Sequence, residues 1–223
     1  MGYLRYLGHS AFEVDIDGKI VYIDPWLSNP KSPVSIDDIS RADIIVVTHF
    51  HGDHVGDAEK LARATGAKIA SIFEVAEYFE KRGLNAVGMN IGGPADIDGL
   101  KILLTPAAHS SELGAPTGVI ILGKEAVVYH AGDTGLFGGM ELYGRLYSID
   151  YALVPIGGHF TMDPEQAGLF VSTFRPRVAI PMHYGTFPVL YGRPEEFVES
   201  VKRYSPDTRV VVSNPGEKIE LSR

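Results

Sequence analysis

The stretch Thr48-His49-Phe50-His51-Gly52-Asp53-His54-Val55-Gly56-Asp57 places four side chains of metal-ligand type within six residues. It follows directly on Ile44-Ile45-Val46-Val47, an apolar and β-branched run that predicts a buried strand. Imidazole nitrogens and carboxylate oxygens are the ligands that a borderline metal ion such as Zn²⁺ prefers. A polar loop with surface histidines is the alternative, but this density of ligands directly after a buried strand favours a metal site.

The spacing within this stretch predicts two half-filled coordination shells. His49 and His51 are two residues apart, so an extended backbone points both side chains to the same face. Asp53 and His54 are adjacent and point apart unless the chain turns, which Gly52 allows. One metal ion would take the first pair and a second ion the other pair. Neither pair completes a shell, so further ligands must come from elsewhere in the chain.

Three more residues of ligand type follow other predicted strands. His109, Asp133 and His183 each come just after an apolar run of strand character. Functional groups of open α/β sheets gather at such strand ends. Each of the three taken alone is better explained as an ordinary core or surface residue. Together they are the types that two half-filled shells need.

The composition sets the class of protein. With 223 residues, 45% of them hydrophobic, the chain can form one domain over residues 1–223 around a sizeable core. The formal charge of −8 makes nucleic acid an unfavoured partner, and the lack of cysteine excludes disulfides and thiolate ligands. There is no signal peptide, and no apolar run approaches the ~20 residues that cross a bilayer. We expect a cytoplasmic protein without a transmembrane segment, and a homo-oligomer is compatible with the sequence.

The order of predicted elements indicates the fold. Apolar alternation predicts strands at residues 3–7, 11–16, 19–23, 44–47, 68–72, 86–89, 100–105, 119–122, 126–129, 151–156, 178–181, 209–213 and 218–221. Helical periodicity predicts helices at 57–64, 73–81, 140–147, 164–174 and 194–204. This order predicts an α/β (α+β) protein, an αββα sandwich of two mixed β-sheets flanked by helices.

The pattern His-x-His-x-Asp-His at residues 49–54, followed by the later histidines and aspartate, resembles the signature of the metallo-β-lactamase superfamily. The chain resembles hydrolases of that superfamily over essentially its whole length. The resemblance implies these ligands: His49, His51 and His109 for one metal ion, Asp53, His54 and His183 for the other, and Asp133 as a bridge. Zinc suits such ligands best, while Mn²⁺, Fe²⁺ or Ni²⁺ fits the same set.

Short stretches around His9, Asp24, Asp133 and His183 narrow the resemblance to short stand-alone metal-dependent hydrolases. These resemble ascorbate-6-phosphate lactonases and phospholipase-D-type enzymes acting on N-acyl phosphatidylethanolamine. The resemblance implies a metal-bridging hydroxide that attacks a small-molecule substrate, either an ester, a lactone or a phosphodiester. The zinc β-lactamases that use cysteine at the position of Asp133 are excluded, because the chain has none.

Residues beside the ligands are assigned supporting roles. Asp53 is our candidate for the general base, and His9 for a substrate contact, a proton shuttle or an extra ligand. Asp24 is expected to orient a ligand histidine, and His130 to support the site from a buried position.

Two further residues are candidates for substrate contacts. His159 follows two glycines at a predicted strand end, although a packed loop explains it almost as well. Tyr184 adjoins His183 and would be either an oxyanion donor or a wall of the pocket.

Two other functions use the same scaffold. Di-iron redox relatives usually carry a carboxylate in place of one motif histidine and a fused flavin domain, whereas this chain has His51 and no room for that domain. A nuclease or phosphodiesterase acting on nucleic acid is disfavoured by the negative charge and by the lack of a basic arm. A non-catalytic metal-binding protein is disfavoured by the complete ligand set.

Overall fold

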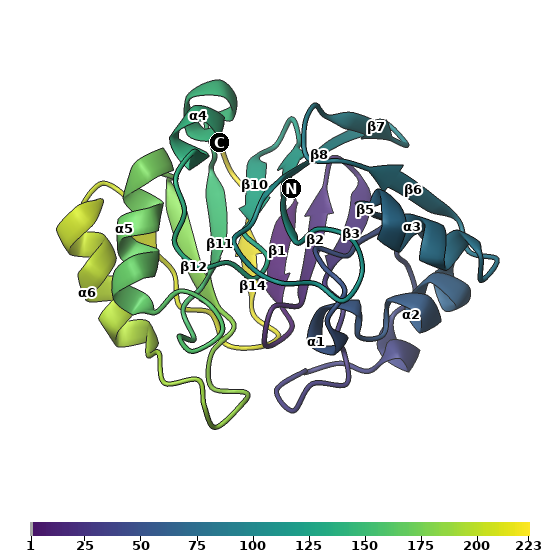
Figure 1. Cartoon of the computed structure of the whole chain (residues 1–223), viewed down its shortest axis with the longest axis horizontal. Coiled ribbons are helices and arrows are strands. Elements are labelled where there is room, and N and C mark those ends of the chain that lie inside the picture. The colour runs from purple at the N-terminus through teal and green to yellow at the C-terminus, as the bar shows by residue number, and fades with distance from the viewer. Residues whose placement is uncertain (1) are drawn as a thin grey trace.

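The computed structural model describes residues 2–223 as two seven-stranded β-sheets packed face to face, with helices on both outer sides (Figure 1). The first sheet has the strand order β14 (Lys218–Glu220), β1 (Tyr3–Tyr6), β2 (Phe12–Ile16), β3 (Lys19–Ile23), β4 (Ile44–Val46), β5 (Lys68–Ile72) and β6 (Ala86–Met89). The second has the order β13 (Arg209–Val210), β12 (Val178–Met182), β11 (Tyr151–Pro155), β10 (Val127–His130), β9 (Thr117–Leu122), β8 (Leu100–Pro106) and β7 (Ala95–Ile97). The predicted αββα sandwich is confirmed.

The helices complete the outer layers. The first sheet is covered by α2 (Ala58–Thr65) and α3 (Phe73–Glu80), and the second by α4 (Met140–Tyr147), α5 (Pro164–Phe174) and α6 (Pro194–Tyr204) (Figure 1). Two short elements lie in loops of the first half, the 3-10 turn at Ile36–Asp38 and the single-turn helix α1 (Gly52–Val55). None of the helices between residues 2 and 223 is long and apolar enough to cross a membrane.

Both sheets mix the two strand directions in the same way. Strands β1 to β3 are antiparallel and β3 to β6 parallel, while β8 to β10 are antiparallel and β10 to β13 parallel. The carboxyl ends of parallel strands meet at one edge of a sheet, where open α/β sheets carry their functional loops. The two sheets thus bring two sets of loops to a common edge of the sandwich.

The alternation of β8 shows how the second sheet is buried on both faces. Ile102 and Leu104 belong to the core between the sheets, whereas Leu103 packs in the outer core with Phe170 and Phe197 of the helices. All these side chains are fully buried. A strand with two buried faces needs an unbroken apolar run, and this is the pattern in the sequence.

Helix α5 begins as predicted. Asp163 accepts a hydrogen bond from the backbone N–H of Gln166, and Pro164 occupies the first helical turn. In return, the backbone N–H of Asp163 donates to Oε1 of Gln166, which completes a capping box and pairs two N–H groups of the helix start.

Three elements differ from the sequence-based expectation. Strand β7 was not predicted, because three residues between turn-forming glycines show too little alternation. The turn at Gly52 closes into the short helix α1, and β13 is shorter than the predicted 209–213. Such short elements depend on their neighbours rather than on their own pattern.

Backbone hydrogen bonds join the two sheets at the edge that carries the functional loops. The N–H of His183, after β12, donates to the carbonyl of His9, after β1, at 2.8 Å. The N–H of Thr117, at the start of β9, donates to the carbonyl of Thr48, after β4, at 3.0 Å. Loops of one sheet are therefore fixed relative to loops of the other.

Candidate metal centre

All seven predicted ligands lie at this edge, and they come from both sheets. The first sheet supplies His49 after β4 and, around the single turn of α1, His51, Asp53 and His54. The second sheet supplies His109 after β8, Asp133 after β10 and His183 after β12. A site between two sheets explains why its ligands are scattered over most of the sequence.

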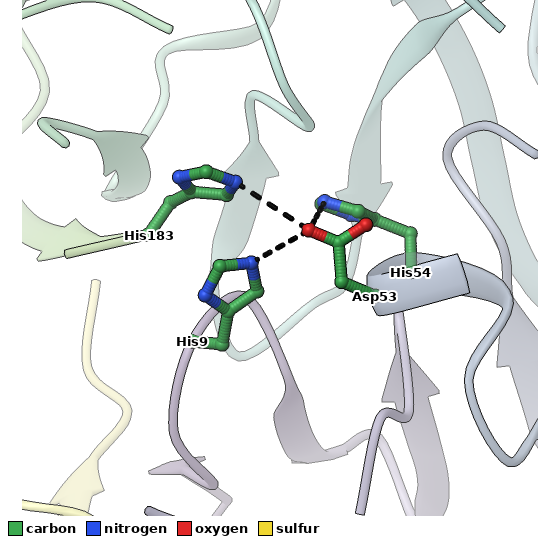
Figure 2. Close-up of side chains that lie close together, drawn as sticks. All are labelled: His9, Asp53, His54 and His183. Atoms are coloured by element: carbon green, nitrogen blue, oxygen red, sulfur yellow. Dashed lines mark hydrogen bonds and ion pairs between the residues drawn. The ribbon is translucent and has the colours of Figure 1, made fainter. Parts of the chain in front are cut away.

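Side-chain distances gather these residues into three overlapping groups, within each of which the potential ligand atoms lie within 4.8 Å of one another. The groups are His49, His51 and His109; His9, Asp53, His54 and His183; and His49, His54 and Asp133. The first equals the predicted shell of one metal ion, and the second contains the predicted shell of the other together with His9. Figure 2 shows the second group, with His9, His54 and His183 converging on the carboxylate of Asp53.

Asp133 lies between the two predicted shells. One of its oxygens, Oδ1, is 3.2 Å from Nε2 of His54, and the other, Oδ2, is 3.0 Å from Nε2 of His183. The same Oδ2 is 3.6 Å from Nε2 of His109, a member of the other shell. Only 3% of the residue is exposed, so this carboxylate faces the histidines rather than water.

Asp24 holds two ligand histidines from behind. It is completely buried and accepts hydrogen bonds from the backbone N–H and the hydroxyl of Thr48, at 2.8 and 2.7 Å. It also accepts one from Nδ1–H of His54 at 2.7 Å. Because the Thr48 hydroxyl donates its hydrogen to Asp24, its oxygen accepts from Nδ1–H of His49, 3.1 Å away. Both rings therefore direct Nε2 away from Asp24 and towards the other candidate ligands, with Nε2 of His49 2.9 Å from Nδ1 of His51.

His9 makes a corresponding contact with Asp53. Its Nε2 lies 3.0 Å from Oδ2 of Asp53, and its Nδ1 lies 2.5 Å from the hydroxyl oxygen of Thr186. An ionised carboxylate only accepts, so Nε2 carries the hydrogen and Nδ1 accepts from the threonine. The ring is completely buried, and its orientation is fixed at both nitrogens. Thr186 was not singled out from the sequence, and its place three residues after His183 is the one available signal.

Three site residues adopt left-handed backbone conformations, with φ of +55° at His9, +47° at Asp24 and +55° at His183. Such conformations cost side-chain-bearing residues on the order of 1 kcal/mol each and are typical of functional sites. In each case the turn lets the chain leave its strand with the side chain directed into the site.

The remaining predicted site residues lie further from the ligands. His130 donates from Nε2 to the carbonyl of Ser10 at 2.9 Å and accepts at Nδ1 from the N–H of Gly132 at 3.0 Å. It thus fixes the residue that precedes Asp133. His159 is exposed, with its ring against Phe160, and Tyr184 is half-buried. Neither lines the cavity at the ligands, so their roles as substrate contacts stay predictions.

Burial and neighbouring charges set the pKa values of the site. Burial lowers the pKa of His9 to about 4 and that of His49 to about 3. Burial also acts to lower the pKa of His54, but the carboxylates of Asp133 and Asp24 outweigh it and hold this pKa well above its usual range. For Asp133, burial opposes ionisation, but His183 and His54 outweigh it and keep the pKa well below its usual range.

Three buried polar atoms of the site have no hydrogen-bond partner of acceptable geometry among residues 2–223: Nε2 of His54, Oδ1 of Asp133 and Nδ1 of His183. Leaving a buried polar atom unpaired costs about 1–3 kcal/mol. Nε2 of His54 and Oδ1 of Asp133 lie close together, and both atom types bind divalent metal ions. The residues present therefore fit a metal ion.

A cavity of about 280 Å³ opens onto the ligands. Five of the predicted ligands line it: His51, Asp53, His109, Asp133 and His183. The other lining residues are Ser110, Phe160 and Phe187, none of which was singled out from the sequence. A cavity of this size can hold a small chemical group but not a segment of a polymer.

Comparison with known proteins agrees with this geometry. The family model for the beta-lactamase superfamily domain matches residues 19–184. The chain belongs to the metallo-β-lactamase superfamily. A UPF0173 metal-dependent hydrolase of Caldivirga maquilingensis is 52% identical, and a protein of the same description from Thermofilum pendens is 53% identical. Each match covers 99% of both chains.

A solved structure extends this agreement to the superfamily's fold. Igni18, described as a novel metallo hydrolase from the hyperthermophilic archaeon Ignicoccus hospitalis, is 48% identical and has a TM-score of 0.93. The match covers 98% of this chain and 97% of Igni18. The predicted superfamily is therefore confirmed, and the chain is a metal-dependent hydrolase of the metallo-β-lactamase superfamily.

Proposed function

We propose that this hydrolase uses two divalent metal ions to cleave a small ester, lactone or phosphodiester. The observation that carries the proposal is the position of Asp133. Its two oxygens face histidines of both ligand groups, as a carboxylate shared by two ions would require. A site for a single metal ion would use only one of the two ligand groups.

The ligand sets follow the side-chain groups. His49, His51 and His109 would hold one ion, Asp53, His54 and His183 the other, and Asp133 would contact both. Imidazole-rich sets favour zinc over harder ions. When bound, such a pair of ions supplies Lewis acidity towards the substrate and lowers the pKa of a water molecule towards neutrality.

Asp53 is positioned to move the proton. Its Oδ2 faces His9, and its side chain is 23% exposed towards the cavity. Although burial opposes ionisation, the hydrogen bond from His9 and the charge of His54 outweigh it and hold the pKa of Asp53 below its usual range. The carboxylate is thus ionised and can accept a proton at Oδ2 as the substrate bond breaks.

His9 keeps that carboxylate in place. The bond from Nε2–H fixes the rotation of Asp53, while Thr186 prevents the ring from turning over. In the first group the corresponding approach is longer, 3.6 Å from Nε2 of His109 to Oδ2 of Asp133. Proton transfer is therefore assigned to the Asp53 side of the site.

The test combines metal content with turnover. Protein stripped with a chelator is reloaded with Zn²⁺, Mn²⁺, Fe²⁺ or Ni²⁺ and assayed on esters, lactones and phosphodiesters. We expect two ions per chain and hydrolysis that depends on both. A single ion per chain, unchanged in His51→Ala, would refute the two-ion proposal. Activity that appears only with iron and oxygen would instead favour redox chemistry.

A further inference from the structure

Two aromatic rings that the proposed proton transfer does not use form the apolar wall of the cavity. Phe160 and Phe187 line it together with the carboxylates and imidazoles. Phe160 is 53% exposed. Covering such a ring with an apolar group is favourable in proportion to the area removed from water.

Phe187 is held in place by its own neighbours. Its ring stacks on Trp26, with centroids 5.8 Å apart and an angle of 19° between the planes. The buried His9 meets it edge-on at 5.3 Å. The position of Phe187 is thus coupled to a residue that orients the candidate base.

The loop of Phe160 is pinned to the loop of Phe187. The N–H of Gly192 donates to the carbonyl of Gly157 at 3.1 Å. The ring of Tyr191 covers Gly158, where φ is +69° and an added Cβ would collide with the ring. Only glycine fits there, so the two loops stay in contact and both rings keep their places in the cavity lining.

The cavity lining formed by residues 2–223 offers no basic side chain to an anionic group. The lining includes the carboxylates of Asp53 and Asp133 but no lysine or arginine among the described residues. Lys31 does not line the cavity. Its Nζ lies 3.3 Å from the backbone carbonyl oxygen of Tyr184 and 5.2 Å from the centre of the Tyr184 ring. Phosphoryl groups are commonly held by arginine or lysine, whereas an uncharged carbonyl needs no such partner.

We propose that the cavity selects an uncharged ester or lactone whose apolar group, about the size of a phenyl ring, fits between Phe160 and Phe187. This inference rests on the proposed hydrolytic function and narrows its substrate class. Hydrolysis adds water across the acyl C–O bond, with the hydroxyl going to the carbonyl carbon and the proton to the leaving oxygen. A phosphodiester would gain the apolar contact, but its negative charge would find no basic side chain in the lining formed by the described residues and would depend on the bound ions alone.

The first experiment measures turnover on the zinc-loaded protein. Two esters share an ethyl leaving group, ethyl phenylacetate and ethyl acetate, and bis-para-nitrophenyl phosphate is the phosphodiester. We expect kcat/KM to be about tenfold or more higher for the phenylacetate than for the acetate, and lowest for the phosphodiester. A phosphodiester that reacts faster than both esters would overturn the inference.

A matched pair of variants locates the effect. Phe160→Ala should abolish the advantage of the phenylacetate through KM, while Phe160→Leu, which keeps an apolar side chain, should retain part of it. Phe73→Ala, at a ring of α3 that is 58% exposed, should leave the advantage unchanged. If Phe160→Ala folds and keeps the full advantage, the ring does not contact the substrate and the inference is wrong.

A binding measurement separates this inference from the proposed function. Trp26 is the only tryptophan and stacks on Phe187, so its fluorescence should report occupation of the cavity. We expect benzohydroxamic acid to bind the zinc-loaded protein about tenfold more tightly than acetohydroxamic acid. Tighter binding without turnover of any ester, lactone or phosphodiester would support the apolar site and refute the proposed function. Equal binding of the two acids alongside turnover would refute the apolar site alone.

Discussion

Replacing Asp24 by asparagine should weaken the binding of both metal ions, although Asp24 is not itself a predicted ligand. The carboxylate accepts three hydrogen bonds, two from Thr48 and one from His54. In the variant an NH₂ group replaces one oxygen. The amide oxygen can keep the bond from the Thr48 N–H, which leaves NH₂ facing the Thr48 hydroxyl and Nδ1 of His54.

Replacing an acceptor oxygen by a donor NH₂ changes the tautomers of two histidine rings, His54 and His49. His54 must turn its Nδ1 into an acceptor, which moves the hydrogen to Nε2, the nitrogen meant for the metal. The Thr48 hydroxyl now accepts from the amide and can donate to His49, which shifts the hydrogen of that ring as well. Because the two histidines belong to different predicted shells, both ions should be affected.

The expected magnitude follows from such outer contacts in other metal sites. Losing one typically lowers metal affinity 10–100-fold, which is about 1.4–2.7 kcal/mol per ion. The folded protein should also lose about 1–3 kcal/mol, because neutral hydrogen bonds replace those that Thr48 and His54 donate to a buried carboxylate. Thr48→Val removes the branch to His49 alone, so it should weaken one ion clearly more than the other.

The assay is competition for Zn²⁺ with a chromophoric chelator, together with urea unfolding of the stripped protein. Asp150→Asn is the matched control, because Asp150 is 6% exposed and accepts from the backbone N–H of Val127 at 2.8 Å. It precedes β11, at the opposite edge of the second sheet, and should lose stability without losing metal. If Asp24→Asn binds both ions within about threefold of the parent protein, the proposed tautomer control is wrong.

Three further outcomes are expected. Asp53→Glu should retain both ions while kcat falls more than about tenfold, because the carboxylate moves by one methylene; normal turnover with full metal content would exclude Asp53 as the base. Thr186→Val should lower kcat with little change in KM, while Thr186→Ser should keep the hydroxyl and the rate; equal rates in both variants would mean that the tautomer of His9 is set elsewhere. In the stripped protein, His9 has a pKa lowered from 6.5 to about 4, so it stays neutral while the unfolded chain takes up a proton below pH 6.5. Stability should therefore fall as the pH drops from 6.5 towards 4, by up to about 3 kcal/mol from His9, and His9→Gln should flatten this slope in urea unfolding. An unchanged slope in that variant would assign the effect to other buried histidines such as His49.

The clustering of the candidate ligands could be predicted because metal binding demands particular residue types at particular strand ends. His49, His51, Asp53 and His54 are close in sequence, and strand ends in this fold share one edge. The long strands could be predicted for a similar reason, since their burial on one or both faces leaves a pattern in the sequence itself.

The walls of the cavity left no such pattern. Phe160 and Phe187 lie in loops whose mutual position depends on contacts among Gly157, Gly158 and Gly192, and no local periodicity encodes these contacts. His159 was chosen in place of its neighbour because histidine is the more familiar functional residue. A histidine can be recognised from its chemistry in a single sequence, whereas an apolar loop residue that lines a cavity is recognised only from its position in space.

The origin of the ligands in both sheets has a mechanical consequence. At the edge that carries the functional loops, few backbone hydrogen bonds join the two sheets, such as those from His183 to His9 and from Thr117 to Thr48. Bound metal ions would join the two sheets at the same edge. A metal ion that binds only while the two sheets are joined at this edge stabilises the joined state by mass action. Chelation should thus do more than abolish catalysis: amide hydrogen exchange should accelerate first at His183 and Thr117, while the strand interiors remain protected. The two sheets of the hydrolase would separate at the edge that carries the candidate metal ligands before either sheet unfolds.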